Sequence, residues 1–169
     1  TLSLILTYKV NSSELVKHKF RETIVINTAL SYQKADSIIS SKKLDTHPIK
    51  NLHLFTIKLK KLEELPSTKL VEHYMLLYNS LLAETLYKSN PNTILRTHKL
   101  SGYQLDESSR VLDPKLQKYL TIINQNAACY VSNSDTGHQD LNLDYYTHAT
   151  SPIRRYVDII NQQNMIRYL

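Results

Sequence analysis

Two adjacent arginines at the start of a predicted helix are the residues of this chain with the clearest chemical potential. They belong to the stretch ATSPIRRYVD, residues 149–158. Thr150 or Ser151 suits the cap of a helix, and Pro152 suits its first position, where the N–H that proline lacks would have no partner. The first turn of a helix favours anions, so two guanidinium groups there indicate a site that an anion such as a phosphate would complete.

A purely structural interpretation of the same arginines is open as well. In a helix that begins near Ser151, Arg154 and Arg155 lie about 100° apart around the axis, so only one of them can point at a bound ligand. Asp158 follows closely enough in the sequence to form an ordinary ion pair with either arginine. The pattern therefore predicts either an anion site or two arginines paired with Asp158 and backbone carbonyls.

Histidines and tyrosines near this stretch have two interpretations each. His138 and His148 flank it and could approach a phosphate, although histidines near loops are more often only hydrogen-bonded. Tyr145, Tyr146 and Tyr156 could stack on nucleic-acid bases or pack into the core. Spacing alone does not decide between these roles.

No metal or phosphate-loop motif is present in the sequence. No set of histidine, cysteine and carboxylate residues has the spacing of zinc ligands. A Mg²⁺ site needs several clustered carboxylates, and the aspartates never cluster along the chain. The only glycines, Gly102 and Gly137, are too far apart for a glycine-rich phosphate loop. We therefore expect no metal in this chain alone, and any phosphate would be held by side chains and a helix end.

The composition predicts a globular segment with a basic surface. The chain has 169 residues, 41% of them hydrophobic, which is enough for one domain with a core. Its formal net charge of +6 favours a polyanionic partner, although ordinary surfaces also carry such an excess. Lys58, Lys60 and Lys61 likewise fit either a solvated helix face or a nucleic-acid patch.

The single cysteine and the hydropathy pattern bear on the compartment. Cys129 lies in a stretch with apolar periodicity, so we expect it in the core and expect the protein in a reducing, intracellular setting. No segment has the length and hydropathy of a membrane span.

The chain begins at Thr1 without a methionine and ends within its last predicted helix, so we expect a piece of a longer protein.

Hydrophobic periodicity predicts a chain of mixed strands and helices. Alternating residues predict strands over 1–10 and 15–30, and helical spacing predicts helices over 31–43, 47–64 and 67–90. A short strand over 93–98, a polar loop over 99–112, a helix over 113–130 and a last helix from 151 follow. No domain boundary is indicated.

The stretch YYTHATSPIRRYVDIINQ, residues 145–162, resembles the most characteristic segment of the RNB domain of ribonuclease II and ribonuclease R type exoribonucleases. That family has an H-x-T-S-P-I-R-R-Y-x-D pattern that continues into a helix. Further segments are similar to other parts of the domain in the same order: LVEHYMLLYNSLLAETL (70–86), TILRTH (93–98) and NAACYVSN (126–133). The resemblance covers essentially the whole chain, as the C-terminal half or so of the domain.

The resemblance implies a fold class and an activity. The fold would be α+β, with residues 1–169 forming the C-terminal portion of an RNB catalytic domain. The activity would be processive 3′→5′ hydrolysis of single-stranded RNA to nucleoside monophosphates, by an intracellular, cytoplasmic enzyme. The family holds Mg²⁺ with aspartates upstream of the matched region, so the Mg²⁺ ligands are expected outside this chain, and the chain alone should be inactive.

The family pattern also implies roles for individual residues. It places Arg154 beside the scissile phosphate as the catalytic residue. Arg155 would support the backbone contact or pair with Asp158. The residues carried over as RNA-binding are Ser151, Arg155, Tyr156, His148 and Glu72. Single-stranded RNA is the expected partner, no membrane is expected, and the sequence indicates no particular protein partner.

Departures from the family pattern leave more than one function open. Gln162 and Gln163 stand where the family usually has a His-Arg pair, which removes a charge near the RNA channel. A strand pair usual between the helices of residues 47–64 and 67–90 is absent, and the segment 99–112 is shortened. An active exoribonuclease is the leading hypothesis, and a catalytically inactive RNB-type protein that binds and regulates RNA is the alternative. A basic domain without an RNA role would require the motif match to be a coincidence.

Overall fold

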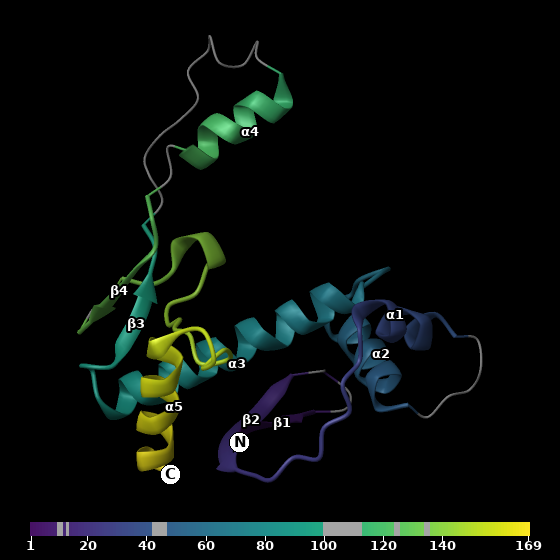
Figure 1. The fold of residues 1–169 in the computed structure, drawn as a ribbon, viewed down its shortest axis with the longest axis horizontal. Helices are drawn as coiled ribbons and strands as arrows, with labels where there is room; N and C mark the ends of the chain where they lie inside the picture. The colour runs from purple at the N-terminus through teal and green to yellow at the C-terminus, as the bar shows by residue number, and fades with distance from the viewer. Residues whose placement is uncertain (10–11, 13, 42–46, 100–112, 124–125, 134–135) are drawn as a thin grey trace. The chain divides into compact units, whose positions relative to one another are not determined.

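The structure, a computed structural model, describes residues 1–9, 12, 14–41, 47–99, 113–123, 126–133 and 136–169. These residues divide into two compact units, residues 1–78 with Leu169 and residues 79–168. Both units contain helices and strands (Figure 1). The predicted α+β class is therefore confirmed.

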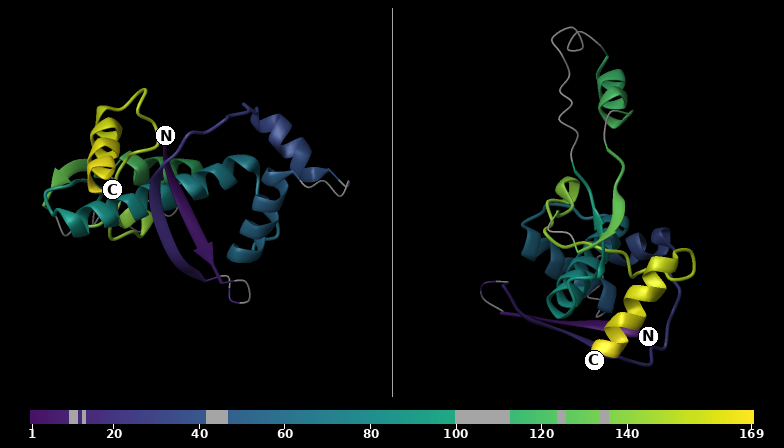
Figure 2. Two further views of the ribbon diagram at one scale, coloured as in Figure 1. Left: turned by 90° about the horizontal axis from the view of Figure 1, so that it is seen from below. Right: turned by 90° about the vertical axis from the view of Figure 1, so that its left-hand side faces the viewer.

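A two-stranded hairpin opens the first unit. Strands β1 (Leu2–Tyr8) and β2 (Leu15–Glu22) pair antiparallel, with Leu4 opposite Phe20 (Figure 2). The predicted strand over 15–30 thus ends earlier than expected, and residues 23–30 lie outside helices and strands. Ile24 and Ile26 in this segment are almost fully exposed, so no apolar neighbour in the structure fixes them in a sheet.

Three helices follow the hairpin: α1 (Tyr32–Ser40), α2 (Pro48–Lys60) and α3 (Ser67–Ser89), the last of which continues into the second unit. Ser31 caps α1, because its Oγ accepts the Lys34 N–H at 3.2 Å. The Asp36 carboxylate accepts the Ser67 N–H at 2.9 Å and so satisfies a free donor at the start of α3. The predicted helix over 47–64 ends at Lys60 because Lys61 adopts the left-handed conformation, with φ of 53°.

Aromatic contacts join the hairpin to these helices within the first unit. The Phe20 ring, which is buried, lies edge-on to Tyr78 with centroids 5.5 Å apart. The Tyr8 ring contacts Phe55 at 5.0 Å in the same way. Edge-to-face pairs of this kind contribute about 0.5–1.5 kcal/mol beyond their buried area.

The second unit contains the rest of α3 and the remaining elements. These are β3 (Ile94–Thr97), α4 (Pro114–Ile123), β4 (Cys129–Ser132), a short 3₁₀ helix η2 (Gln139–Leu141) and α5 (Tyr156–Tyr168). Strands β3 and β4 pair antiparallel, with Leu95 opposite Val131. Its core consists of the buried side chains Leu82, Ala83, Leu86, Leu95, Tyr146, Ala149 and Met165.

The predicted helix over 113–130 is wrong for its last residues, 126–130. Helix α4 ends at Ile123, and Cys129 begins strand β4 opposite Thr97. Pairing with β3 supplies the backbone hydrogen bonds of this segment and overrides its helical periodicity. Cys129 is exposed, so its expected place in the core is wrong as well.

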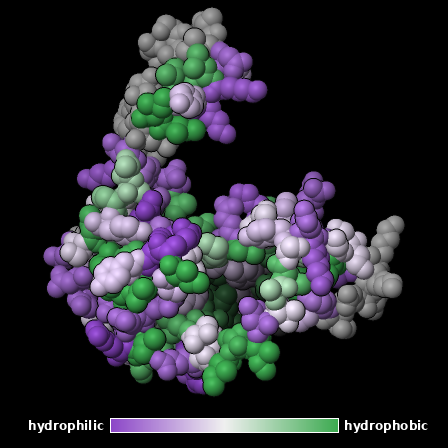
Figure 3. Space-filling model, viewed as in Figure 1, coloured by the Kyte–Doolittle hydropathy of each residue, from purple (hydrophilic) through white to green (hydrophobic). Residues whose placement is uncertain are grey.

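Apolar side chains lie on the surface of α4. Leu116, Ile122 and Ile123 are 44%, 55% and 60% exposed, and Figure 3 shows hydrophobic residues over this helix. Among the helices that the structure describes, none combines the length and the hydropathy needed to cross a bilayer. The predicted loop over 99–112 lies outside the described residues.

We predict that Leu82→Ala lowers the free energy of unfolding by about 2–5 kcal/mol, because it removes a fully buried leucine and leaves a cavity. Urea denaturation followed by circular dichroism measures this change. Leu54→Ala is the control, since Leu54 is 55% exposed and its truncation should cost less than about 1 kcal/mol. Equal losses in both variants would contradict the core described here.

Candidate functional site

The stretch that carries the paired arginines forms a turn before the last helix rather than its first turn. The N–H groups of Arg154 and Arg155 both donate to the Ser151 carbonyl at 3.2 Å, and α5 begins only at Tyr156. The predicted helix start at Ser151, with Pro152 in the first helical position, is therefore wrong. The turn leads directly into α5 (Figure 1).

The Asp158 carboxylate explains why the helix starts late. This side chain is fully buried, and its Oδ1 accepts the Ser151 N–H at 2.7 Å. Arg155 approaches the same carboxylate with two nitrogens of one guanidinium edge: Nη2 donates to Oδ1 at 2.8 Å, and Nε forms an ion pair with Oδ2 at 2.8 Å. The carboxylate of Asp158, near the start of α5, thus holds both the first and the last residue of the preceding turn, Ser151 and Arg155.

Arg155 and Arg154 consequently have different environments. The Arg155 side chain is only 19% exposed and its charge is balanced by Asp158, so the structural interpretation applies to this arginine. Arg154 is exposed, and its guanidinium group forms no hydrogen bond or ion pair with any residue that the structure describes. Its exposed neighbours on the turn include Ile153 and Tyr156, at 102% and 76%. The turn therefore presents one unbalanced cation beside an apolar and an aromatic side chain.

The backbone that leads to this turn is attached to strand β3. The Tyr146 carbonyl accepts the Arg96 N–H at 2.8 Å. The buried Thr147 hydroxyl donates to the Ile94 carbonyl at 2.7 Å. These bonds fix residues 146–147 along the edge of the small sheet.

Buried amide side chains attach the next residues to α3 and α5. Asn79, in α3, accepts the Ala149 N–H through its Oδ1 at 3.0 Å. Asn161, in α5, donates from Nδ2 to Thr147 Oγ1 at 2.8 Å and to the His148 carbonyl at 3.0 Å. Gln162 donates to the Ala149 carbonyl. Both asparagines are almost fully inaccessible to solvent, so the polar backbone of this loop is satisfied by side chains instead of water.

His148 lies in an aromatic and cationic setting. Its Nδ1 is 2.5 Å from the Tyr130 hydroxyl, and its ring lies edge-on to Tyr146 at 5.6 Å. The Arg96 guanidinium covers the Tyr130 ring at 5.5 Å. Burial lowers the pKa of His148 to about 4, and the positive charges of Arg155 and Arg96 contribute to this shift. His148 is therefore a neutral hydrogen-bonding group at pH 7.

The other aromatic candidates are mostly packed. His138 stacks on His98 with centroids 5.3 Å apart, and burial lowers its pKa. The Tyr145 ring contacts Tyr87 at 4.9 Å, and Tyr146 is buried. Of Tyr145, Tyr146 and Tyr156, the last has the most exposed ring.

The structure brings most of the predicted site residues together in one unit. Ser151, Arg154 and Arg155 share the turn, Tyr156 follows it as the first residue of α5, and His148 precedes it. Glu72 belongs to the first unit, where its carboxylate pairs with Lys69 at 2.6 Å. The roles of these residues toward RNA stay predictions.

Sequence reasoning missed the residues that hold the loop. Asn79 and Asn161 are polar residues within the apolar faces of two helices, which is the signal that could have indicated them. Gln162, at a departure from the family pattern, supplies a neutral donor to the loop.

No metal site is formed by the described part of the chain. Within it, no three His, Cys, Asp or Glu side chains come together in a way that could hold an ion. A magnesium ion binds to several oxygen ligands, so the described side chains do not fit a Mg²⁺ site.

The comparisons of this chain with known proteins agree with one another. A sequence model of the family described as the RNB domain matches residues 43–169. Ribonuclease R of Chlamydia trachomatis is 26% identical over 205 residues, covering 83% of this chain and 29% of that protein. DIS3-like exonuclease 2 of Caenorhabditis elegans is 33% identical over 132 residues, covering 56% of this chain and 16% of that protein. The chain thus spans less than a third of the length of these relatives.

Solved structures share the fold. Mycoplasma genitalium RNase R in complex with ribose methylated single-stranded RNA has a TM-score of 0.70 at 15% identity, covering 100% of this chain and 37% of that chain. Yeast Ssd1, described as a pseudonuclease, has a TM-score of 0.69 at 17% identity, covering 98% of this chain and 29% of that chain. These TM-scores show that both proteins share their fold with this chain.

We predict that Asp158→Ala lowers the free energy of unfolding by about 3–5 kcal/mol, because it leaves the Arg155 charge largely buried without a partner. Urea denaturation measures the loss, and Asp144→Ala, at an exposed aspartate, is the control. The double variant Asp158→Ala/Arg155→Ala should lose less than the sum of the two single variants. Additive losses would show that the two side chains do not act as a pair.

We predict that His148 makes the protein less stable in acid. Its pKa of about 4 is below the ordinary value, so the unfolded chain binds more protons than the folded one between about pH 6.5 and pH 4. Stability contributed by the neutral ring is complete above this range and is lost as the pH falls through it. In His148→Gln the free energy of unfolding should fall less steeply over the same range, and an unchanged slope would contradict the assignment.

Proposed function

The chain belongs to the RNB domain family, and from this membership we propose that it forms the C-terminal part of the catalytic domain of a Mg²⁺-dependent 3′→5′ exoribonuclease that degrades single-stranded RNA to nucleoside monophosphates. The observation that carries the proposal is the exposed Arg154 on a turn held by the buried Asp158. Ribonuclease R and DIS3-like exonuclease 2 among the relatives support it. The single cysteine of the chain fits the intracellular location that we propose with it.

Arg154 suits the stabilisation of a phosphodiester transition state. Negative charge builds on the phosphoryl oxygens as the bond to the leaving oxygen breaks, and a guanidinium group can donate to two of these oxygens at once. Such a donor is most effective when it is held in place before the reaction, because no reorganisation is then needed. The fixed backbone from Tyr146 to Arg155 provides this support, and Arg154 extends from it into solvent.

The neighbours of Arg154 would bind RNA without adding net charge. Asp158 balances Arg155, so Arg155 acts by holding the turn. His148 is neutral at pH 7 and can offer a hydrogen bond to a phosphate or ribose. The exposed ring of Tyr156 can stack on a base, as aromatic side chains do in single-strand binding sites. Ser151, in the same turn, stays a candidate for an RNA contact on the family pattern, as does Glu72 of the first unit.

The proposed Mg²⁺ would be bound by residues of the protein outside this chain. Bound magnesium would supply the charge that activates water and neutralises the phosphate. Since the described residues do not form such a site, this chain alone should not cleave RNA.

A second function has a specific observation in its favour. The fold is similar to that of yeast Ssd1, a pseudonuclease, and Gln162 and Gln163 replace a charged pair of the family pattern. A catalytically inactive RNB-type protein would bind RNA and leave it intact. Its RNA affinity would fall steeply with salt, as for any protein that neutralises phosphates.

We predict that Arg154→Ala in the complete protein lowers the rate of RNA cleavage by about 10²–10³ and changes RNA affinity much less. The assay follows 5′-labelled single-stranded RNA with Mg²⁺ on a gel, beside a filter-binding measurement. Wild type should shorten the RNA stepwise from its 3′ end. Arg154→Lys should recover only part of the rate, because lysine keeps the charge and loses the planar fork.

Arg167→Ala is the matched control, since Arg167 is an exposed arginine near the end of α5 and outside the turn. Equal losses in Arg154→Ala and Arg155→Ala, entirely in binding, would refute the catalytic role of Arg154. Binding of RNA by wild type without any shortening would favour the inactive RNB-type protein.

A further inference from the structure

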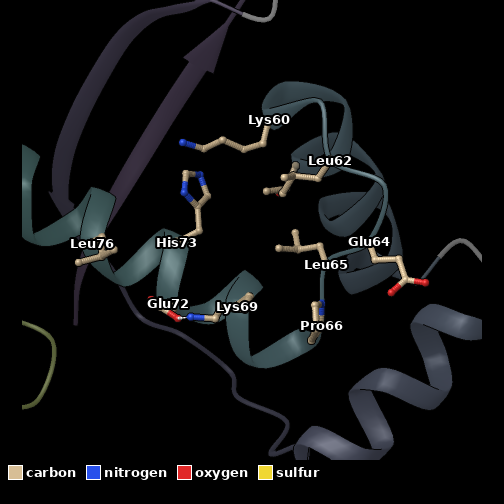
Figure 4. A pocket seen from close by; sticks show the side chains of 10 residues that line it. Lys60, Leu62, Glu64, Leu65, Pro66, Lys69, Glu72, His73 and Leu76 are labelled. Atoms are coloured by element: carbon tan, nitrogen blue, oxygen red, sulfur yellow. Dashed lines mark hydrogen bonds and ion pairs between the residues drawn. The ribbon is translucent and has the colours of Figure 1, made fainter. Parts of the chain in front are cut away.

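A cleft in the first unit has apolar walls and two cationic or basic side chains at one side. Its volume is about 430 Å³, within the range of small-molecule sites. The end of α2, the connection over 61–66 and the first turns of α3 line it (Figure 4). None of its residues belongs to the turn that carries Arg154, so its function is a separate question.

The walls of the cleft are mostly aliphatic. Leu62, Leu65, Pro66 and Leu76 line it, and Leu62 keeps 41% of its surface exposed. Covering such surface with an apolar ligand is favourable by about 25 cal/mol per Å². The cleft therefore suits a ligand whose body is apolar.

Lys60 and His73 are two neighbouring polar side chains of the cleft that have no partner in the described part of the chain. Figure 4 shows their side chains pointing toward each other from α2 and α3. The Lys60 ammonium forms no hydrogen bond or ion pair with the part of the chain that the structure describes. His73 Nε2 is inaccessible to solvent and has no hydrogen-bond partner there. A buried nitrogen of this kind is costly to leave unpaired, and an oxyanion that entered between the two side chains as the flexible Lys60 side chain rotated would satisfy both.

The other charged residues that line the cleft do not neutralise the positive charge beside Lys60 and His73. The Lys69 ammonium is already bound to the Glu72 carboxylate at 2.6 Å. Glu64 points away from Lys60 and His73 in Figure 4. One net positive charge is thus left at this side of the cleft, which fits a ligand with a single negative charge.

We propose that this cleft binds a small organic carboxylate with an apolar body, whose carboxylate lies between Lys60 and His73 and whose body covers the leucines. A nucleotide fits less well, because the polar edges of its base would meet aliphatic walls without hydrogen-bond partners. The proposal does not depend on the RNA activity proposed above.

Protonation of His73 should accompany binding. Burial lowers the pKa of His73, and the Lys60 charge lowers it further, so the ring is neutral at pH 7. A bound carboxylate offsets both effects and raises this pKa. The complex therefore takes up a proton, and the affinity rises as the pH falls below neutrality.

The test measures binding of 2-naphthoate to the complete protein by isothermal titration calorimetry. Lys60→Ala should weaken binding about tenfold, as expected for a lost hydrogen bond to a charged group, while Lys58→Ala, on the same helix outside the cleft, should not. The neutral 2-naphthamide should bind about tenfold more weakly than 2-naphthoate. His73→Gln should keep part of the affinity and lose its pH dependence.

Several results would overturn the proposal. These are the absence of saturable 2-naphthoate binding, equal affinities in Lys60→Ala and Lys58→Ala, and equal binding of 2-naphthoate and 2-naphthamide. Preferential binding of adenosine 5′-monophosphate with the same dependence on Lys60 would also overturn it, since the cleft would then be a nucleotide site.

Discussion

The buried carboxylate of Asp158 determines how the turn before α5 is built. A carboxylate without access to water is stable as an anion only when charged or strong donors surround it. Here the Ser151 N–H and the Arg155 guanidinium supply them, at 2.7 Å and 2.8 Å. Because Arg155 is needed for this purpose, the two adjacent arginines cannot have the same role. The ion pair leaves Arg154 as the arginine that faces solvent.

Besides the ion pair of Asp158 and Arg155, neutral side chains also hold the loop before α5. Asn79, Asn161 and Gln162 bind the backbone of the loop without bringing further charge into the interior of the second unit. An amide can donate and accept at once, so one side chain can satisfy groups that face it from different directions. Asn79 does this, because its Oδ1 accepts the Ala149 N–H and its Nδ2 donates to the Tyr146 hydroxyl. Gln162, where the resemblance implies a histidine, donates to the Ala149 carbonyl, and this hydrogen bond does not change with pH. The departure therefore removes a titratable group and keeps the loop attached.

Local features of the sequence predicted local parts of the structure. Helix α3 follows from its long apolar stripe and β3 from a short β-branched run, because periodicity decides such elements. Strand β4 was missed because its partner β3 is more than 30 residues away in the sequence. The late start of α5 depends on a side chain capturing a backbone N–H, which no propensity describes. The motif located the two arginines, and only the structure distinguished the exposed Arg154 from the paired Arg155.

The amides of Ala149 and Ser151 donate to side chains of two different helices. Asn79 belongs to α3 and Asp158 to α5, so neither amide proton can reach water unless the loop leaves the helix that holds it. Hydrogen exchange at these two positions should therefore be slow and should report opening of the loop as one cooperative unit. A loop held in this way has the dynamics of the helices around it, although it contains no regular secondary structure of its own.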